Sequence, residues 1–341
     1  MVDPVKKNVV IHVGLPKAGS TYLQKNIFPN IRDVFFLGRD ENDPISKCLD
    51  YISWKNPFTL DLDSLRIEMD KQMKRHSEQG ALFSREAFFG NFYTSFVCNR
   101  TTAEALNKVF PDAKIFIVIR RQDKLAESAY KQSLHQGGYL TIKKFLGYKK
   151  GKFNYYNIPL QDSSACIDVT QLRWNFLIQN YYDFFGKEKV MVLPQEMLRE
   201  DPKKFLEIFY NFTGFEKYLP SYKKKSSINK GYSYLSVWLS IYLNRFFRRK
   251  GHAGGFIPQK PFYEFLYNRK DANIIWRILE RLSASLQIRV FLQKGFDKIF
   301  YVNKKMINKK ISKEIMEIHS IDNKHLSKTI GIDLSKWGYH K

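Results

Sequence analysis

The residues from Gly14 to Thr21 combine glycine, lysine and hydroxyl side chains in the order GLPKAGST. The glycines permit a tight turn whose backbone N–H groups point inward, and the helix expected after the turn adds its own free N–H groups. Lys17 and the hydroxyls of Ser20 and Thr21 place further donors around the same point. This combination predicts a nest that binds an anion such as a phosphate group.

The position of Lys17 distinguishes this loop from the phosphate loop that binds ATP. A Walker A loop has its lysine directly after the last glycine, and the following Ser or Thr holds Mg²⁺. Here the lysine comes before the second glycine, Gly19, and Ser20 follows that glycine. A site for a nucleoside triphosphate with Mg²⁺ is therefore a poor fit. A strand-to-helix turn without any ligand stays open as an alternative.

A second pair of residues suits a phosphate group of its own. Arg120 directly follows KIFIVI, the strongest apolar run of the chain, and Ser128 comes eight residues later in the helix expected next. A guanidinium can bind two phosphate oxygens at once, and a hydroxyl adds another donor. Taken alone, such a pair indicates no more than a surface arginine and a serine within a helix. Its interpretation as a phosphate site therefore depends on the loop at 14–21.

The loop and the Arg-x7-Ser pair together resemble the sulfotransferases that use 3′-phosphoadenylyl sulfate (PAPS). The resemblance is closest to the bacterial-type enzymes that sulfate glycans. It covers most of the chain, because NKHL and GIDLSKW near the end are similar to the closing helix and turn of that family. One departure is Ser20-Thr21, where the family often has Thr-Thr.

This resemblance implies a three-layer α/β fold, with a central parallel sheet flanked by helices as in P-loop NTPases. It implies one sulfotransferase domain over residues 1–341. Within it we expect an α/β core with the PAPS site at 1–220, a basic and mostly helical segment at 221–312, and a closing helix and turn at 313–341.

The resemblance also implies a role for each matched residue. Lys17 is expected to contact the bridging oxygen of PAPS and to stabilise the leaving phosphate, and Arg120 with Ser128 is expected to hold the 3′-phosphate. PAPS is the expected cofactor, and no metal is expected. The residues expected to hold the cofactor are Lys17, Ala18, Gly19, Ser20, Thr21, Tyr22, Arg120 and Ser128.

The transfer also needs a base that takes a proton from the acceptor. Glu86, in FSREAF, ends the apolar run before the one that carries Arg120, and the family commonly has a catalytic histidine or glutamate there. A positioned base contributes roughly 10²–10⁴ to the rate. Asp40, Glu41 and His135 stay open as alternatives to Glu86.

Apolar runs indicate the elements that must position these residues. We expect strands at 9–13, 34–37, 81–83, 114–119 and 189–193, and helices at 20–28, 102–109, 123–136, 172–185 and 202–213. Continuously apolar strands that alternate with helices are typical of a parallel sheet covered on both faces. Since ligands of such sheets bind beyond the carboxyl ends of the strands, Gly14, Glu86 and Arg120 should meet at one edge. His12 lies inside the first strand, where we expect a buried histidine with a hydrogen-bond partner.

The overall composition limits the class of partner and the compartment. Lysine and arginine number 57 against 33 acidic residues, a net charge of +24, which attracts anionic glycans, phosphorylated cofactors, nucleic acids or lipids. The three cysteines have no spacing that indicates a zinc site or a disulfide framework. We find neither a signal peptide nor an apolar run of the ~18 residues that span a membrane. The sequence therefore predicts a cytoplasmic protein.

Three functions stay open at this point. The first is a PAPS-dependent sulfotransferase that acts on a hydroxyl or amino group of a carbohydrate or polysaccharide by in-line attack. The second is a nucleoside or sugar kinase with a variant loop, against which the displaced lysine argues. The third is a non-catalytic protein that binds nucleic acid or membrane through the basic and aromatic residues of 221–312. It leaves the loop and the Arg-x7-Ser pair unexplained.

For the first function we expect a glycan or another hydroxyl acceptor as the partner, and an anionic acceptor would suit the positive charge of the chain. We expect no nucleic-acid partner. Peripheral membrane contact through the apolar stretch at 234–243 stays open, as does the oligomeric state. Acceptor specificity is expected in loops at 38–80 and 137–170 and in the basic C-terminal part.

Overall fold

The computed structural model describes residues 7–38, 43–54, 59–153, 166–218, 232–248, 257–258, 295–300, 302 and 304–341. The chain divides into two compact units. The first comprises residues 1–122, 170–226 and 316–341, and the second comprises residues 123–169 and 227–315. Each unit is built from segments that are distant in the sequence, and the expected single domain over 1–341 stays a prediction.

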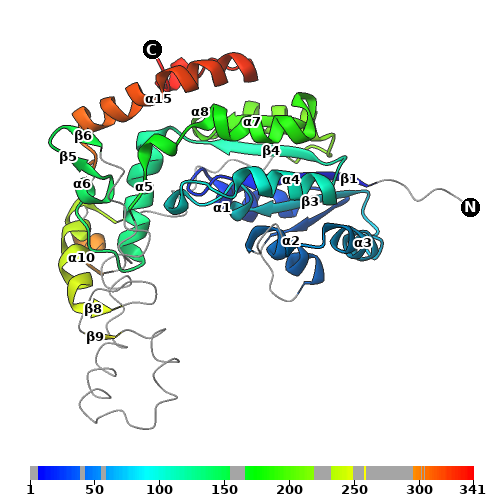
Figure 1. Cartoon of the computed structure of the whole chain (residues 1–341), viewed down its shortest axis with the longest axis horizontal. Coiled ribbons are helices and arrows are strands. Elements are labelled where there is room, and N and C mark those ends of the chain that lie inside the picture. Colours follow the sequence, from blue (N-terminus) through cyan, green and yellow to red (C-terminus); the bar gives the residue numbers. More distant parts are fainter. Residues whose placement is uncertain are drawn as a thin grey trace, which may run out of the picture. The chain divides into compact units, whose positions relative to one another are not determined.

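A five-stranded sheet forms the centre of the first unit (Figure 1). Its strands lie in the order β2-β3-β1-β4-β7, and all four neighbouring pairs are parallel. The strands are β1 (Asn8–Gly14), β2 (Val34–Leu37), β3 (Gly80–Arg85), β4 (Lys114–Ile119) and β7 (Val190–Pro194). The predicted α/β class and all five predicted strands are confirmed.

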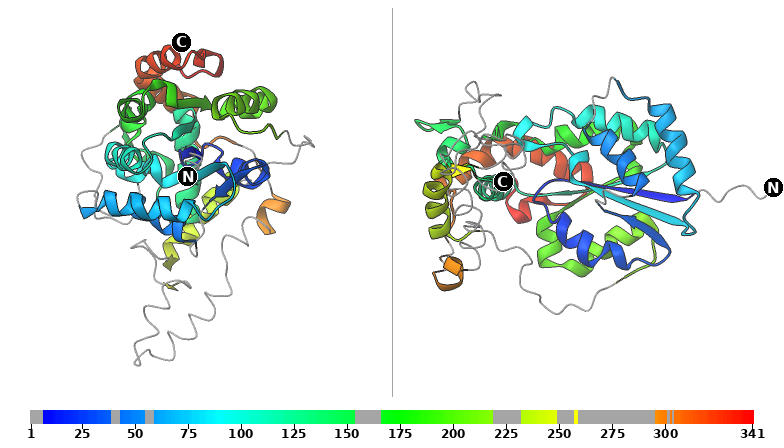
Figure 2. Two further views of the ribbon diagram at one scale, coloured as in Figure 1. Left: turned by 90° about the vertical axis from the view of Figure 1, so that its right-hand side faces the viewer. Right: turned by 90° about the horizontal axis from the view of Figure 1, so that it is seen from below.

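Helices cover both faces of this sheet (Figure 2). On one face lie α1 (Ser20–Asn26) and α9 (Pro202–Thr213). Phe209 of α9 has its ring 5.8 Å from that of Phe28 and 4.9 Å from that of Phe116 in β4. These contacts seal that face of the sheet from water.

The opposite face carries α4 (Asn99–Val109) and α7 (Trp174–Phe185). Phe83 of β3 lies 5.5 Å from Phe110 at the end of α4, measured between ring centroids. The buried amide of Asn180 in α7 donates to Asn99 of α4 at 2.8 Å, which joins the two helices. The predicted arrangement of a parallel sheet between two helix layers is confirmed.

The helix ends follow local chemistry that the sequence shows. Helix α9 begins at Pro202, and the side chain of Asp201 accepts a hydrogen bond from the N–H of Lys204 at 3.0 Å. Helix α1 ends at Asn26, two residues before the predicted end, and a 3₁₀ turn with Pro29 follows. The prolyl ring has no N–H to donate, so the chain leaves the helix there.

The expectation of a loop over 38–80 is wrong. The segment contains α2 (Pro44–Trp54) and α3 (Leu62–Met73). Each begins at an aspartate whose carboxylate caps it: Asp43 accepts from Ser46 N–H and Asp61 from Ser64 N–H, both at 3.0 Å. The capping aspartates indicate both helices, and the buried Ile45, Leu49 and Ile52, which recur at helical spacing, indicate α2.

The second unit contains most of α5 (Gln122–His135), which begins at the last residue of the first unit. It also contains α6 (Ile142–Phe145), α10 (Tyr234–Phe246), α14 (Asp297–Ile299) and the two-residue strands β5 (Tyr148–Lys149), β6 (Lys152–Phe153), β8 (Phe247–Arg248) and β9 (Ile257–Pro258). The expected loop at 137–170 therefore holds a short helix and a hairpin, and residues 154–165 lie outside the described part.

Side-chain amides and carboxylates hold α10 in the second unit. Asn244 donates to the carbonyls of Leu134 and Gly138, both at 2.8 Å, and Asp297 accepts from Ser236 Oγ at 2.5 Å near the start of the helix. A further helix, α15 (Lys309–Ile330), starts in this unit and ends in the first. None of the described helices combines the length and apolarity that a membrane crossing requires.

Candidate functional site

The strand order of the first unit reverses the direction of its connections between β1 and β4. The chain leaves β1 towards β2 on one side of the sheet and leaves β4 towards β7 on the other side. Where neighbouring parallel strands send their connections in opposite directions, a crevice opens beyond their carboxyl ends. Gly14 ends β1, Arg120 follows β4, and Glu86 follows β3 on the other side of β1. The predicted meeting of these positions at one edge is confirmed.

The loop after β1 has a strained backbone at its lysine. Lys17 has a φ of 70° and Gly19 a φ of 103°, both in the left-handed region. A β-carbon on Gly19 would lie 3.2 Å from Nε2 of Gln195, which begins α8 (Gln195–Glu200) after β7. Left-handed geometry at a lysine costs on the order of 1–3 kcal/mol, and such strain concentrates at functional sites.

The backbone amides of the loop divide into two groups. The N–H of Ala18 donates to the carbonyl three residues earlier at 3.1 Å, and the N–H of Tyr22 donates to Gly19 at 2.9 Å, so both complete the turn itself. Within the described part of the chain, no backbone carbonyl accepts a hydrogen bond from the N–H groups of Gly19, Ser20 and Thr21. These are the amides that an anion could engage.

Arg120 lies against this loop. Its Nη1 donates to the carbonyl of Lys17 at 2.7 Å. Its own carbonyl accepts from the indole N–H of the fully buried Trp174 at 2.9 Å. The side chain and the main chain of Arg120 are thus each fixed by a separate partner, which holds the guanidinium beside the loop.

Glu86 completes the cluster from the neighbouring strand. It is the first residue of a 3₁₀ helix, η3 (Glu86–Phe88), and it packs against Gly14, where a β-carbon would lie 3.3 Å from Glu86 Cα and 3.0 Å from Ser20 Oγ. The side chain of Glu86 reaches solvent at the edge of the site. The surrounding protein nevertheless removes part of the water around the carboxylate, and this desolvation raises the pKa of Glu86. The charge of Lys17 and the hydroxyl of Ser20 oppose this shift of the pKa without cancelling it.

The structure therefore brings four of the sequence-predicted residues together in the first unit: Lys17, Ser20, Glu86 and Arg120. Ser128 and His135 lie in α5 within the second unit, where the ring of His135 lies 3.8 Å from that of Tyr232. Their part in the site stays a prediction. Asp40 and Glu41 lie outside the described residues.

His12 is buried and hydrogen bonded, as predicted. Its Nδ1 lies 2.7 Å from Ser84 Oγ, and its ring packs between those of Phe28 and Phe116. Burial lowers its pKa to about 3, so the imidazole is neutral at physiological pH. His12 therefore supports the sheet and has no accessible proton to exchange with a substrate.

Two residues at this edge were missed in the sequence. Gln195 follows β7 and lies against Gly19, and the rule that singled out Glu86 and Arg120 at strand ends would have found it. Trp174, which binds the Arg120 carbonyl, comes from the start of α7, and no local sequence signal connects the two. No cluster of three or more His, Cys, Asp or Glu side chains suited to a metal ion occurs among the residues that the structure describes.

The segment after α15 packs against the chain that follows β4 and β7. Arg121 donates to the carbonyl of Trp337 at 3.0 Å, and the hydroxyl of Tyr339 donates to Glu196 at 2.8 Å. Burial and the neighbouring Glu196 carboxylate raise the pKa of Tyr339. The last residues of the chain thus close over the elements that hold Arg120 and Gln195.

No protein-family model matches the chain, and comparison with curated proteins finds no match. Among solved structures, the chain is similar to a sulfotransferase from Alicyclobacillus acidocaldarius, with a TM-score of 0.42 and 18% identity over 80% of this chain and 100% of that one. It is also similar to mouse sulfotransferase SULT7A1 complexed with PAP, with a TM-score of 0.34 and 13% identity over 92% of this chain and 89% of that one. At these values neither likeness bears on the chemistry of this chain.

Proposed function

We propose that this protein is a sulfotransferase that moves the sulfuryl group of PAPS to a hydroxyl or amino group of a carbohydrate or polysaccharide. The observation that carries the proposal is the cluster at the carboxyl edge of the sheet. There Lys17 and Glu86 lie beside one loop, and Arg120 donates to the backbone of that same loop. A cation, a base and a second cation at one edge suit group transfer from a doubly phosphorylated donor.

The chemistry of the donor groups fits PAPS. The amides of Gly19, Ser20 and Thr21 would hold the 5′-phosphate, since none of them donates to a described backbone carbonyl. Arg120 would bind the 3′-phosphate, to which Ser128 is assigned from the sequence alone. PAPS supplies the activated sulfuryl group and leaves as 3′,5′-adenosine bisphosphate.

The remaining steps belong to two side chains. Lys17 places its ammonium where negative charge develops on the leaving phosphate oxygen, which lowers the barrier because the charge is already oriented. Glu86 takes the proton of the acceptor hydroxyl while the acceptor oxygen forms its bond to sulfur and the bond from sulfur to the leaving oxygen breaks. The raised pKa of Glu86 makes its carboxylate a stronger base than a glutamate of ordinary pKa.

The charge of the whole chain supports an anionic acceptor. A net charge of +24 attracts an acidic polysaccharide and speeds its encounter with the enzyme, as it also attracts the cofactor. Acceptor binding of this kind weakens as salt rises, because the attraction is screened over about 8 Å at physiological ionic strength.

The test compares two nucleotides by thermal denaturation. We expect 3′,5′-adenosine bisphosphate without metal to raise the melting temperature, and ATP with Mg²⁺ to raise it less or not at all. A kinase would show the reverse order, and a nucleic-acid-binding protein would respond to oligonucleotides alone. Transfer of radiolabelled sulfate from PAPS to a panel of polysaccharides would then identify the acceptor class.

A further inference from the structure

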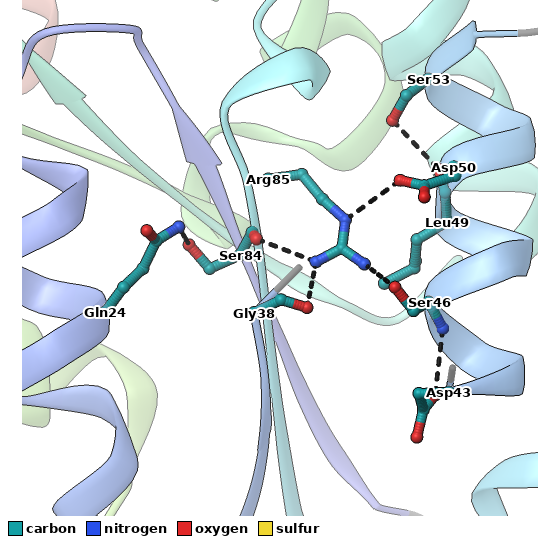
Figure 3. Close-up of polar contacts among 9 residues, drawn as sticks. All are labelled: Gln24, Gly38, Asp43, Ser46, Leu49, Asp50, Ser53, Ser84 and Arg85. Carbon is teal, nitrogen blue, oxygen red and sulfur yellow. Dashed lines mark hydrogen bonds and ion pairs between the residues drawn. The ribbon is translucent and has the colours of Figure 1, made fainter. Parts of the chain in front are cut away.

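The otherwise apolar strand β3 ends with two polar residues, Ser84 and Arg85, and Glu86 follows them. Successive side chains of a strand point to opposite faces of the sheet. Ser84 accordingly faces α1 and Arg85 faces α2, as Figure 3 shows. Glu86 follows as the proposed base.

Arg85 is held by one group at the end of β2 and two on α2. Its Nη1 donates to the carbonyl of Gly38, which follows β2. Its Nη2 donates to Ser46 Oγ at 2.6 Å, and its Nε lies 3.5 Å from a carboxylate oxygen of Asp50 (Figure 3). Arg85 itself is only 4% exposed, whereas the side chain of Asp50 is 30% exposed and reaches solvent.

Burying the guanidinium of Arg85 costs free energy, because the charge loses its contact with water. Replacing a buried ion pair by apolar side chains of similar volume is often neutral or stabilising, so stability alone does not account for Arg85. The guanidinium does offer rigid geometry, since its planar fork binds several acceptors in fixed directions. The backbone of Arg85 is extended, with φ −137° and ψ 127°, and the turn at Glu86 starts from it.

Ser84 provides the anchor on the opposite face. Its hydroxyl oxygen accepts from Nε2 of Gln24 at 2.8 Å and lies 2.7 Å from Nδ1 of His12. Gln24 belongs to α1, the helix that directly follows the loop with Lys17. The end of β3 is therefore tied to the phosphate loop on one side and to α2 on the other.

We propose that Arg85 is a positioning residue that holds the carboxylate of Glu86 against Lys17 and Ser20. It acts through the backbone of the residue that follows it, without a role in binding PAPS. The inference rests on the proposed function, in which Glu86 is the base. A displacement of about 1 Å at a catalytic group costs on the order of 10²-fold in rate, so a side chain that prevents such a displacement has a measurable effect.

The test is a double-mutant cycle with Arg85→Met, Glu86→Gln and the double variant. We expect Arg85→Met to lower kcat by about 10- to 100-fold while KM for PAPS changes by less than about twofold. In the Glu86→Gln background the same change should add less than about twofold, because two residues that act as one unit are not additive. An equal loss in both backgrounds, or a kcat of Arg85→Met close to wild type, would overturn the proposal.

A second readout needs no activity. In wild-type protein labelled with ¹³C at glutamate carboxylates, the pKa of Glu86 should be raised, whereas Arg85→Met should return it towards the ordinary value as the carboxylate moves into solvent. An unchanged pKa in Arg85→Met would also overturn the proposal. If Arg85→Met does not fold, Arg85→Lys keeps the charge opposite Asp50 but not the fork, and we expect the same direction of change.

Arg100→Met is the matched control. Arg100 bridges α4 and α7 through an exposed ion pair with Asp183 at 3.0 Å, so its loss should leave kcat and the pKa of Glu86 unchanged. Binding of 3′,5′-adenosine bisphosphate to the wild type tests the proposed function separately. If the bisphosphate does not bind, the proposed function fails and the inference with it. If it binds but the cycle shows additivity, only the role of Arg85 fails.

Discussion

The guanidinium of Arg120 donates a hydrogen bond to the backbone carbonyl of Lys17, with Nη1 and O 2.7 Å apart. The two residues are far apart in the sequence and belong to the ends of neighbouring strands, β1 and β4. The bond places the cation proposed for one phosphate directly against the loop proposed for the other. It also explains how a lysine with a left-handed backbone is held, since its carbonyl has a charged donor.

Lys17 supplies the first prediction. Lys17→Ala should lower kcat by on the order of 10²–10³, because a donor aimed at developing charge is lost. Lys17→Gly should be equally inactive but more stable than Lys17→Ala by about 1 kcal/mol, since glycine adopts a φ of 70° without strain. Urea unfolding measures the second difference. Wild-type turnover in purified Lys17→Ala would end the assignment of this lysine.

Arg120 and its neighbour Arg121 provide a matched pair. Arg120→Met should weaken binding of 3′,5′-adenosine bisphosphate by about 10- to 100-fold, which corresponds to a charged hydrogen bond of roughly 1.5–3 kcal/mol. Arg121→Met removes the same charge one residue later, where the side chain binds the Trp337 carbonyl, and should leave this affinity within about twofold. Isothermal calorimetry distinguishes them. If both variants lost the same affinity for the bisphosphate, the effect of Arg120→Met would come from the lost net charge and not from a direct contact with the phosphate.

Glu86 predicts a pH dependence of activity. The carboxylate must be ionised to accept a proton, and its pKa is raised by burial. The acidic limb of the profile of kcat/KM should therefore lie above the ordinary glutamate pKa of about 4.3. Glu86→Gln should remove this limb together with most of the activity. A limb that persists unchanged in the residual activity of Glu86→Gln would assign the titration to another group.

Ionisation of Glu86, which activity requires, should lower the stability of the fold. A raised pKa means that the folded state binds more protons than the unfolded state, so the free energy of unfolding falls as pH rises through this window. Glu86→Gln should thus melt at a higher temperature than wild type at pH 7, and the difference should vanish below about pH 3, where Glu86 is protonated in both states. A variant less stable than wild type at pH 7 would show that the charge of Lys17 outweighs burial.

Gly19 tests the contact between the loop and α8. Gly19→Ala puts a β-carbon 3.2 Å from Gln195 at a φ of 103°, and should both destabilise the fold by about 1–2 kcal/mol and abolish bisphosphate binding. Gly331→Ala is the control: its φ is 67°, and among the described residues no heavy atom beyond its two chain neighbours lies within 4 Å of the added carbon. It should show the loss of stability but keep the binding. Retained binding in Gly19→Ala would argue against the loop as the phosphate site.

His12 predicts acid sensitivity of the first unit. Its pKa is lowered to about 3 by burial, so between about pH 6.5 and that value the unfolded state binds one proton more. As pH decreases over this range, the contribution of His12 to the free energy of unfolding falls by about 1.4 kcal/mol per pH unit. His12→Gln should flatten the decline seen by urea unfolding, whereas His325→Gln, at an exposed position, should not. Parallel curves for wild type and His12→Gln would contradict this account.

Apolar runs were enough to predict the sheet, because a strand buried on both faces is apolar over most of its length. They were also enough to place Gly14, Glu86 and Arg120 at one edge, since parallel strands share the direction of their carboxyl ends. Helices α2 and α3 were missed because their one-sided burial mixes polar and apolar residues, so that their signals were limited to the capping aspartates and, in α2, the helical spacing of the apolar residues.

The interactions that fix the site were not predictable in the same way. The contact of Trp174 with the Arg120 carbonyl joins distant segments through a single hydrogen bond, which leaves no periodicity in the sequence. The contacts of Arg85 with Gly38 and Ser46 are of the same kind. Local patterns show which element a residue belongs to, whereas its partners depend on the packing of the whole unit.

The membership of residues 316–341 in the first unit has a consequence for biosynthesis. Strand β1 leaves the ribosome more than 300 residues before Trp337 and Tyr339, which bond to Arg121 and to Glu196. During translation the sheet therefore lacks the contacts that residues 316–341 supply, and contacts between such distant segments form slowly. A nascent chain stalled before residue 316 should therefore be the species that chaperones hold, and release of the final helix should be the event that frees it.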